Sequence, residues 1–271
     1  LVEEAGGEVG QLQEQGFKTA KILLVDDHEE ILSYLEEFLQ DSFEIHTATD
    51  GQKALQYLEA NVVDLVLSDV MMPELDGLHL CKRIKQNINT SHIPVILLTA
   101  KSELSQQLKG MEMGADDYIT KPFSPPLLKA KLLNILKSRK RLKEYYAENK
   151  EIVPENIAFN TIDEEFLKEA IAIIENHLSD SDFSVDKFSR EIGMSRSNLY
   201  LKFKAITGES ATDFIKRIRF TKAVELMQTQ RYTIAQIAYM CGFNSPSYFS
   251  TAFKQYYGYM PSEYMEKKKA E

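Results

Sequence analysis

The chain has 271 residues, with 41 acidic and 32 basic side chains and a formal net charge of −9. This length suits two ordinary domains with separate cores, and the acidic balance argues against a chain that binds a polyanion along its whole length. No apolar run is long enough to span a bilayer, no signal-peptide pattern is present, and the two cysteines lack metal-ligand spacing. We therefore expect a cytoplasmic chain without membrane contact.

Charge is segregated along the sequence. Residues 1–150 carry 17 basic and 24 acidic side chains, a net charge of −7, whereas residues 184–260 carry 11 basic and 5 acidic ones, a net charge of +6. A polyanionic partner is thus expected at the second half. Residues 1–18 are polar and begin with Leu1 rather than methionine, so we expect a tail or linker there, in a chain that is processed or part of a longer polypeptide.

Apolar strands and amphipathic helices alternate in the first half. Strands are predicted at residues 21–25, 43–47, 65–68, 94–99 and 118–120, and helices at 31–39, 50–59, 78–85, 104–113 and from Ser124 onward. The run 65–67 is apolar throughout, which is typical of a strand buried on both faces. This pattern predicts an α/β fold, a doubly wound five-stranded parallel sheet.

Five polar side chains come at the carboxyl ends of the predicted strands, where open α/β sheets bind ligands: Asp26, Asp27, Asp69, Thr99 and Lys121. Three carboxylates repel one another unless a cation lies among them, and their hard oxygens suit Mg²⁺. A lysine and a hydroxyl opposite can then bind the oxygens of a phosphoryl group carried by Asp69. The alternative is that each residue merely caps its own strand, but the convergence of five favours a phosphoacceptor site.

Residues 20–140 resemble the receiver domain of two-component response regulators, which has a flavodoxin-like fold. The resemblance rests on Asp26-Asp27, on Asp69 followed by Met72-Pro73 and Asp76-Gly77, on Thr99-Ala100 and on Lys121-Pro122. It implies that Asp69 accepts a phosphoryl group from a histidine kinase. It also implies that Thr99 and Lys121 contact the phosphoryl oxygens.

The same resemblance implies a Mg²⁺ site and a conformational switch. Asp27 and Asp69, with Asp26 close by, would hold the ion together with the backbone carbonyl of Met71. Thr99 and Tyr118 match the family's switch pair, in which the hydroxyl moves toward the phosphoryl group and the aromatic ring rotates inward. The Lys121-Pro122 peptide bond is expected to be cis.

Apolar residues beyond the fifth strand recur at alternating steps of four and three. They are Leu128, Leu132, Ile135, Leu142 and Tyr146, with Arg139 in register between Ile135 and Leu142. One interpretation is a seam through which two chains form a homodimer. The other is that the first half of this helix packs on the sheet and the rest is a solvated linker. Pro154, within residues 152–160, breaks the helix and marks a boundary.

The second half contains an internal repeat. A helix is predicted from a capping box at Thr161–Glu164 through Leu178. After it, residues 184–193 align with 233–242 as helices that begin at a hydroxyl cap and end at a glycine, and residues 195–203 align with 245–253 as the helices that follow. Two helix-turn-helix units in an all-α domain are therefore expected.

The second helix of such a unit enters the major groove with residues near its start. The exposed polar residues expected there are Arg196, Ser197 and Tyr200 in the first unit and Ser247, Ser250 and Thr251 in the second. Lys202, Lys204 and Lys254 are better placed for phosphates. The alternative, a plain helical bundle, is less favoured because of the repeat and the positive charge.

Residues 163–267 resemble the DNA-binding domain of the AraC/XylS family. The resemblance rests mainly on the second repeat, through Ile234-Ala235, Ile237-Ala238, Cys241-Gly242-Phe243, Tyr248-Phe249, Phe253-Lys254, Gly258 and Pro261-Ser262. It implies seven helices, with a long one at about 211–229 between the two units, and double-stranded promoter DNA as a partner. The expected limits are a tail or linker at 1–18, a receiver domain at 19–140, a helical linker at 141–160 and the DNA-binding domain at 161–271.

Together the resemblances imply a transcription regulator rather than an enzyme, in which phosphorylation of Asp69 controls dimerisation and promoter binding. The kinase would be a separate protein or part of the same polypeptide, as in hybrid two-component systems. In the second case the chain would be the cytoplasmic part of a membrane-anchored protein. Two alternatives are a Mg²⁺-dependent phosphohydrolase that uses Asp69 as its nucleophile and a receiver that acts only as a docking module.

Overall fold

The computed structural model describes residues 17–100, 113–148 and 154–270. The chain divides into two compact units, Leu1–Leu142 and Lys143–Glu271, and the division falls inside helix α6 (Pro125–Glu148). The helix predicted at 104–113 lies almost wholly outside the described residues, and so does most of the predicted tail at 1–18. Within the described ranges, no helix is both long and apolar enough to cross a membrane.

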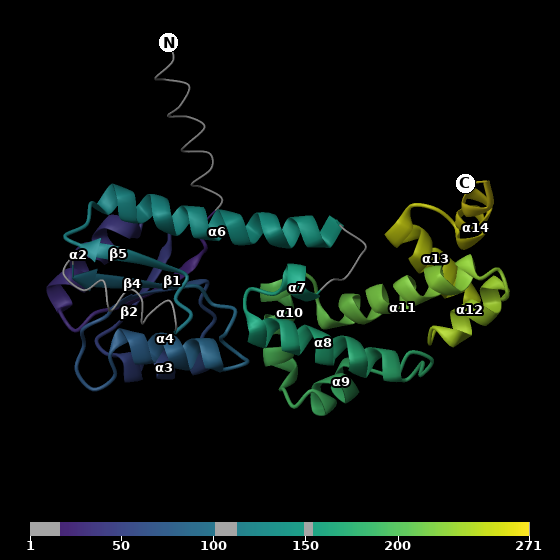
Figure 1. Cartoon of the computed structure of the whole chain (residues 1–271), viewed down its shortest axis with the longest axis horizontal. Coiled ribbons are helices and arrows are strands. Elements are labelled where there is room, and N and C mark those ends of the chain that lie inside the picture. Colours follow the sequence, from purple (N-terminus) through teal and green to yellow (C-terminus); the bar gives the residue numbers. More distant parts are fainter. Residues whose placement is uncertain (1–16, 101–112, 149–153, 271) are drawn as a thin grey trace, which may run out of the picture. The chain divides into compact units, whose positions relative to one another are not determined.

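The first unit is built on a five-stranded sheet in which all neighbouring strands are parallel, in the order β2-β1-β3-β4-β5 (Figure 1). The strands are β1 (Lys21–Val25), β2 (Glu44–Ala48), β3 (Leu65–Asp69), β4 (Val95–Ala100) and β5 (Asp117–Lys121). This confirms the predicted doubly wound parallel sheet. The strand order also places β1, β3 and β4 in the middle, where both faces are covered.

Helices cover the two faces of the sheet (Figure 1). In addition to α6 they are α2 (Glu29–Leu39), α3 (Gly51–Ala60) and α4 (Gly77–Gln86). Alternate residues of a strand point to opposite faces. Ile22 and Leu24 of β1 therefore pack with α2 and α6, whereas Leu23 and Val25 pack with α3 and α4. Because both faces are buried, β1 is apolar at four successive positions, as the sequence showed.

The first half of α6 packs on this sheet. Leu128 and Leu132, which were predicted to lie on an interchain seam, are 0% exposed and belong to the core formed with β1 and β3. Ile135 packs against the same core. The seam prediction is therefore wrong for Leu128 and Leu132, because an apolar stripe on a helix fits the face of a sheet as well as it fits a partner helix. The alternative interpretation holds for this half of the helix.

Arg139, in register with that stripe, binds within the first unit. Its guanidinium lies 2.7 Å from the Asp116 carboxylate and donates to the carbonyl of His92. Asp116 also forms an ion pair with Lys85 of α4, in which Lys85 Nζ lies 2.7 Å from Asp116 Oδ2. Leu142 is partly buried, and the side chain of Tyr146 lies outside the described residues. A dimer contact on α6 would need exposed side chains such as Leu127.

The second unit is all-α. Its helices are α7 (Pro154–Ile157), α8 (Thr161–Asn176), α9 (Val185–Glu191), α10 (Arg196–Thr207), α11 (Ala211–Gln228), α12 (Ile234–Met240), α13 (Pro246–Tyr257) and α14 (Pro261–Ala270). The pairs α9–α10 and α12–α13 precede and follow the long helix α11 (Figure 1), which confirms the two predicted helix-turn-helix units. Gly242 ends the first helix of the second pair with a φ of +72°, and a Cβ there would lie 2.4 Å from the Leu178 carbonyl oxygen, so the turn requires glycine.

Side-chain caps begin most of these helices. Ser184 and Thr233 accept backbone N–H groups at the starts of α9 and α12, as predicted, and Ser195 and Ser245 do the same at the starts of α10 and α13. The cap predicted at Thr161 is wrong. Asn160 takes that place, one residue earlier, and its side chain accepts from the Asp163 N–H at 2.9 Å. Asparagine caps helices at least as well as threonine, so the helix begins one residue earlier and is capped equally well.

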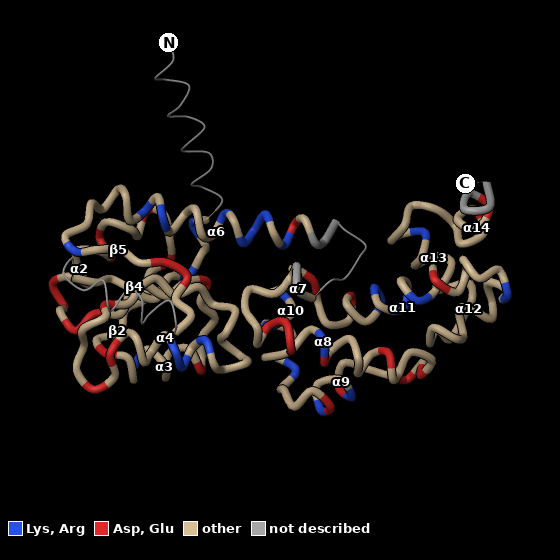
Figure 2. Tube along the Cα trace, in the orientation of Figure 1, with Lys and Arg blue, Asp and Glu red and all other residues tan. Residues whose placement is uncertain are grey.

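Among the residues described in the second unit, three basic side chains are buried. Lys202, predicted to be placed for phosphates, is 0% exposed, and its Nζ lies 2.5 Å from Asp163 Oδ1. The prediction for Lys202 is therefore wrong. Arg217 and Arg219 of α11 are buried as well. The positive charge that DNA can meet is thus smaller than the sequence count of +6, and the other lysines and arginines of this range are spread over α9, α10, α11, α13 and the segment before α12 (Figure 2).

The buried pair predicts a specific pattern of stability. Lys202→Met should lower the free energy of unfolding by about 3–5 kcal/mol, because it leaves the Asp163 carboxylate buried without its charge partner. The double variant Asp163→Leu/Lys202→Met should recover most of that loss, since neither charge of this pair is then buried. Urea unfolding of the whole chain measures both. Lys204→Met, on the exposed side of the same helix, is the control, and an equal loss in this variant would contradict the explanation.

Candidate functional site

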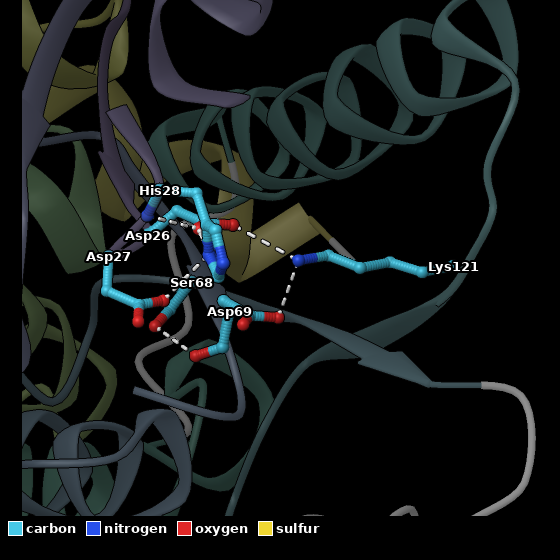
Figure 3. Close-up of polar contacts among 6 residues, drawn as sticks. All are labelled: Asp26, Asp27, His28, Ser68, Asp69 and Lys121. Atoms are coloured by element: carbon cyan, nitrogen blue, oxygen red, sulfur yellow. Dashed lines mark hydrogen bonds and ion pairs between the residues drawn. The ribbon is translucent and has the colours of Figure 1, made fainter. Parts of the chain in front are cut away.

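Asp69 and Lys121 meet at the carboxyl edge of the sheet (Figure 3). Asp69 is the last residue of β3 and is 7% exposed, and Lys121 is the last residue of β5. Lys121 Nζ lies 2.8 Å from Asp69 Oδ1 and 3.1 Å from Oδ2 of Asp26, which directly follows β1. One ammonium thus holds two carboxylates from different strands, as the strand-end argument predicted.

This contact shapes the protonation of both partners. Burial raises the pKa of Asp69, and the hydrogen bond and charge of Lys121 offset that effect only in part. For Lys121, burial alone would lower the pKa, but the hydrogen bond to Asp69 and the charges of Asp69 and Asp26 outweigh burial and raise it. The lysine therefore stays cationic, while Asp69 is held in an environment that disfavours its charge.

A second carboxylate pair lies at the start of α2. His28 Nδ1 is 3.2 Å from Asp26 Oδ1 and 3.1 Å from Asp27 Oδ1, and the three residues offer ligand atoms within 4.8 Å of one another. The hydrogen bond from the imidazole to Asp26 and then the charge of Asp27 raise the pKa of His28. Asp27 Oδ1 is buried and has no hydrogen-bond partner among the described residues, since its approach to the imidazole is an ion pair without hydrogen-bond geometry.

His28 is a site residue that the sequence predictions missed. The available signal was its position directly after the Asp26-Asp27 pair. The loop after β3 is the other feature that positions the site. Gly77 N donates to the Val70 carbonyl at 3.0 Å, and a Cβ on Gly77 would lie 2.0 Å from the Asp69 carbonyl oxygen, so only glycine fits. Met71 lies in this loop with its side chain exposed.

Thr99 and Tyr118 lie on the neighbouring strands β4 and β5, where the register pairs Thr99 with Thr120 and Leu97 with Tyr118. The Thr99 hydroxyl and the Tyr118 hydroxyl are both buried and have no hydrogen-bond partner among the described residues. Burial raises the pKa of Tyr118 to about 12. The Lys121-Pro122 bond is cis, as expected. Two buried hydroxyls without partners are the kind of group that a new acceptor in the pocket would satisfy.

The recognition helices present most of the predicted DNA-contact residues. On α10, Arg196, Ser197, Tyr200 and Lys204 are exposed, and Arg196 forms a surface ion pair with Asp186 at 2.8 Å. On α13, Ser247, Thr251 and Lys254 are exposed, whereas Ser250 is partly buried. The hydroxyls of Ser250 and Thr251 donate back to the carbonyls of Pro246 and Ser247. The second helix is thus left with fewer free polar groups than predicted.

These observations define a class of protein: an α/β domain with a strand-end carboxylate held by a lysine, followed by a domain with two helix-turn-helix units. Residues 22–133 match the response regulator receiver domain family, and residues 188–267 match a helix-turn-helix domain family. The chain therefore contains a receiver domain of the response regulator family, followed by a helix-turn-helix domain of the AraC type.

Relatives support this assignment. The chain is 41% identical over 246 residues to a histidine kinase P4 of Formosa agariphila. The match covers 91% of the chain and 18% of that protein. It is 44% identical over 118 residues to the alkaline phosphatase synthesis transcriptional regulatory protein PhoP of Bacillus subtilis, covering 43% of the chain and 48% of that protein. The chain thus spans less than half of the length of either relative.

A solved structure is also similar. The signal receiver domain of a signal transduction histidine kinase from Syntrophus aciditrophicus is 35% identical, with a TM-score of 0.44, and the match covers 45% of the chain and 94% of that structure.

The environment of Asp69 predicts a pH-dependent stability change. Because the folded protein raises the pKa of Asp69, its ionised form is disfavoured by folding at every pH above that pKa. Asp69→Asn should therefore stabilise the chain at pH 7 in the presence of a chelator. The gain should shrink as the pH falls through the raised pKa and should vanish below the ordinary value of 3.8, where the carboxyl is neutral in both states. Thermal unfolding across this pH range tests it, with the exposed Asp41→Asn as control; a gain that does not change with pH would contradict this cause.

Proposed function

We propose that this chain is a phosphorylation-regulated DNA-binding transcription regulator, in which Asp69 accepts a phosphoryl group and its state controls the helix-turn-helix domain. The observation that carries the proposal is the Lys121 ammonium 2.8 Å from a buried carboxylate at a strand end, in a chain that also carries two recognition helices. The helix-turn-helix domain favours this function over a phosphohydrolase.

The residues around Asp69 suit phosphoryl transfer. An Asp69 carboxylate oxygen forms the new bond to phosphorus, while the bond from phosphorus to the donor nitrogen breaks and its electron pair stays with the donor imidazole. Lys121 neutralises charge on the phosphoryl oxygens, as it already does for two carboxylates. The unpartnered hydroxyl of Thr99 then has an acceptor to which it can donate.

We further propose Mg²⁺ as the ion of this pocket. Asp26, Asp27 and Asp69 offer hard carboxylate oxygens, and the buried Asp27 Oδ1 without a hydrogen-bond partner fits a cation ligand. Asp27 and Asp69, with the Met71 carbonyl, would hold the ion. When bound, Mg²⁺ would neutralise charge on the phosphoryl oxygens.

The donor we propose is a histidine kinase, either a separate protein or part of the same polypeptide. The relative from Formosa agariphila bears that name and contains a segment similar to almost the whole of this chain, which supports the second arrangement. A homodimer formed on phosphorylation also remains a proposal, with exposed residues of α6 such as Leu127 in place of the buried leucines.

Phosphorylation tests the receiver directly. With Mg²⁺ and a small-molecule phosphodonor such as acetyl phosphate, the chain should gain one phosphoryl group on Asp69, measured by intact mass and by phosphate-affinity electrophoresis. Asp69→Asn should abolish the gain, because the amide is no nucleophile. Asp64→Asn, at the opposite end of the same strand region, should keep it. Phosphorylation that survives in Asp69→Asn would refute the assignment.

The first recognition helix predicts a split between specificity and affinity. Arg196→Ala should relax the preference at one or two base pairs at a cost of about 1–3 kcal/mol, because an arginine at the start of a recognition helix contacts base edges. Its exposed ion pair with Asp186 is weak enough to be exchanged for DNA. Lys254→Ala should instead weaken binding to all sequences similarly and reduce the salt dependence. Binding titrations on selected and random DNA distinguish the two, and equal losses on both for Arg196→Ala would make it a phosphate contact.

A further inference from the structure

The first turn of α13 presents one large side chain. Tyr248 is the third residue of this helix and is 55% exposed. Its backbone N–H donates to the capping Ser245 Oγ at 3.4 Å, and its ring centroid lies 6.3 Å from that of Phe243, which is buried in the core of the second helix-turn-helix unit. The ring is therefore anchored at its base and exposed at its outer part, at the end of a recognition helix that lies nearest to the bases.

The other candidates on this helix are less able to discriminate bases. The hydroxyls of Ser250 and Thr251 are engaged with helix carbonyls, at 2.9 and 3.1 Å. Pro246 has no polar side chain, and Lys254 lies in the last turn, where phosphate contacts are expected. Ser247 is exposed but small. Tyr248 thus supplies most of the contact surface of the first turn.

The two helix-turn-helix units also differ in charge. The first turn of α10 begins with Arg196, whereas the aligned position of α13 is Pro246, and Tyr248 stands where α10 has Asn198. Between residues 230 and 260 the only charged side chains are Arg231 and Lys254. Apart from the neutral polar side chains of Asn244 and Ser247, a recognition surface with so little charge discriminates bases by apolar contact and shape. In the major groove the apolar group that distinguishes one base from the others is the C5 methyl of thymine.

We propose that Tyr248 is a specificity-determining residue of the second helix-turn-helix unit, and that its ring packs against a thymine methyl group in the part of the DNA site that α13 contacts. This inference rests on the proposed DNA-binding function and names the base that one of its two recognition helices prefers. It assigns the discrimination to the ring and not to the phenol hydroxyl.

Selection of bound sequences from random DNA, with the full chain, gives the first test. Wild type and Tyr248→Phe should select the same site, because the ring is kept. Tyr248→Ala should lose the preference for one thymine while the rest of the site persists, and Arg196→Ala should alter a different part of the site. Tyr239→Ala is the matched control, since Tyr239 is also 55% exposed but lies on α12, the first helix of the unit.

Replacement of the selected thymine by uracil removes only the methyl group and gives the second test. Wild type and Tyr248→Phe should lose about fourfold in affinity, the value expected when the burial of one methyl-sized group is lost. Tyr248→Ala should bind both duplexes equally. Because Tyr248 is exposed, circular dichroism should show the variant folded.

The outcomes separate two failures. Wild-type protein that selects no sequence at all would refute the proposed DNA-binding function. Specific binding in which Tyr248→Ala keeps the thymine preference, or still loses affinity on uracil, would overturn the role of Tyr248 alone. Loss of the preference in Tyr248→Phe would move the discrimination to the hydroxyl and overturn the methyl contact.

Discussion

The chemistry of the first domain depends on the ion pairs that the Lys121 ammonium forms with two carboxylates. This ammonium lies within 3.1 Å of the carboxylates of Asp26, which follows β1, and Asp69, which ends β3; these residues are far apart in sequence and meet only because parallel strands end at one edge. Without a cation between them, Asp26 and Asp69 would repel each other in a buried pocket. The same ammonium can exchange one carboxylate for phosphoryl oxygens, so the group that stabilises the resting pocket is also the group that would detect its modification.

The strand that carries Lys121 also connects the pocket with α6. Within β5, Asp117 pairs with Lys131 of α6 at 2.8 Å, and the Tyr118 carbonyl accepts from the same lysine at 3.1 Å. Just before the strand, Asp116 binds Arg139. A shift of β5 that accompanies satisfaction of the Thr99 or Tyr118 hydroxyl would therefore act on a helix that continues past residue 142. These contacts form a continuous physical route from the pocket to α6.

The parts of this structure that were predictable are those encoded locally. Buried parallel strands, strand-end carboxylates and a repeated helix-turn-helix each leave a short pattern in the sequence. Leu132 and Lys202 were placed wrongly because their environment is set at long range. A heptad-like stripe does not reveal whether a sheet or a second chain will cover it. The sequence around Lys202 likewise does not indicate that its partner is Asp163, 39 residues earlier. His28 lay beside a recognised motif, but a histidine after two aspartates has no fixed role until its imidazole is positioned.

The long helix α11 explains why the two recognition helices need not use the same chemistry. Arg219 donates to the Gly242 carbonyl at 3.0 Å and to the Asp180 carbonyl at 2.6 Å, which ties α11 to the turn of the second unit. Arg217 pairs at 2.6 Å with Glu209, which lies just after α10, the last helix of the first helix-turn-helix unit. Burial raises the pKa of that carboxyl to about 7, so much of its charge depends on the arginine. These guanidiniums fix the helix-turn-helix units to a common scaffold and are not available to phosphates. The repeat therefore preserves the backbone of the recognition unit, whereas the charge of its recognition helix differs, because α10 exposes Arg196 and Lys204 and α13 exposes Lys254.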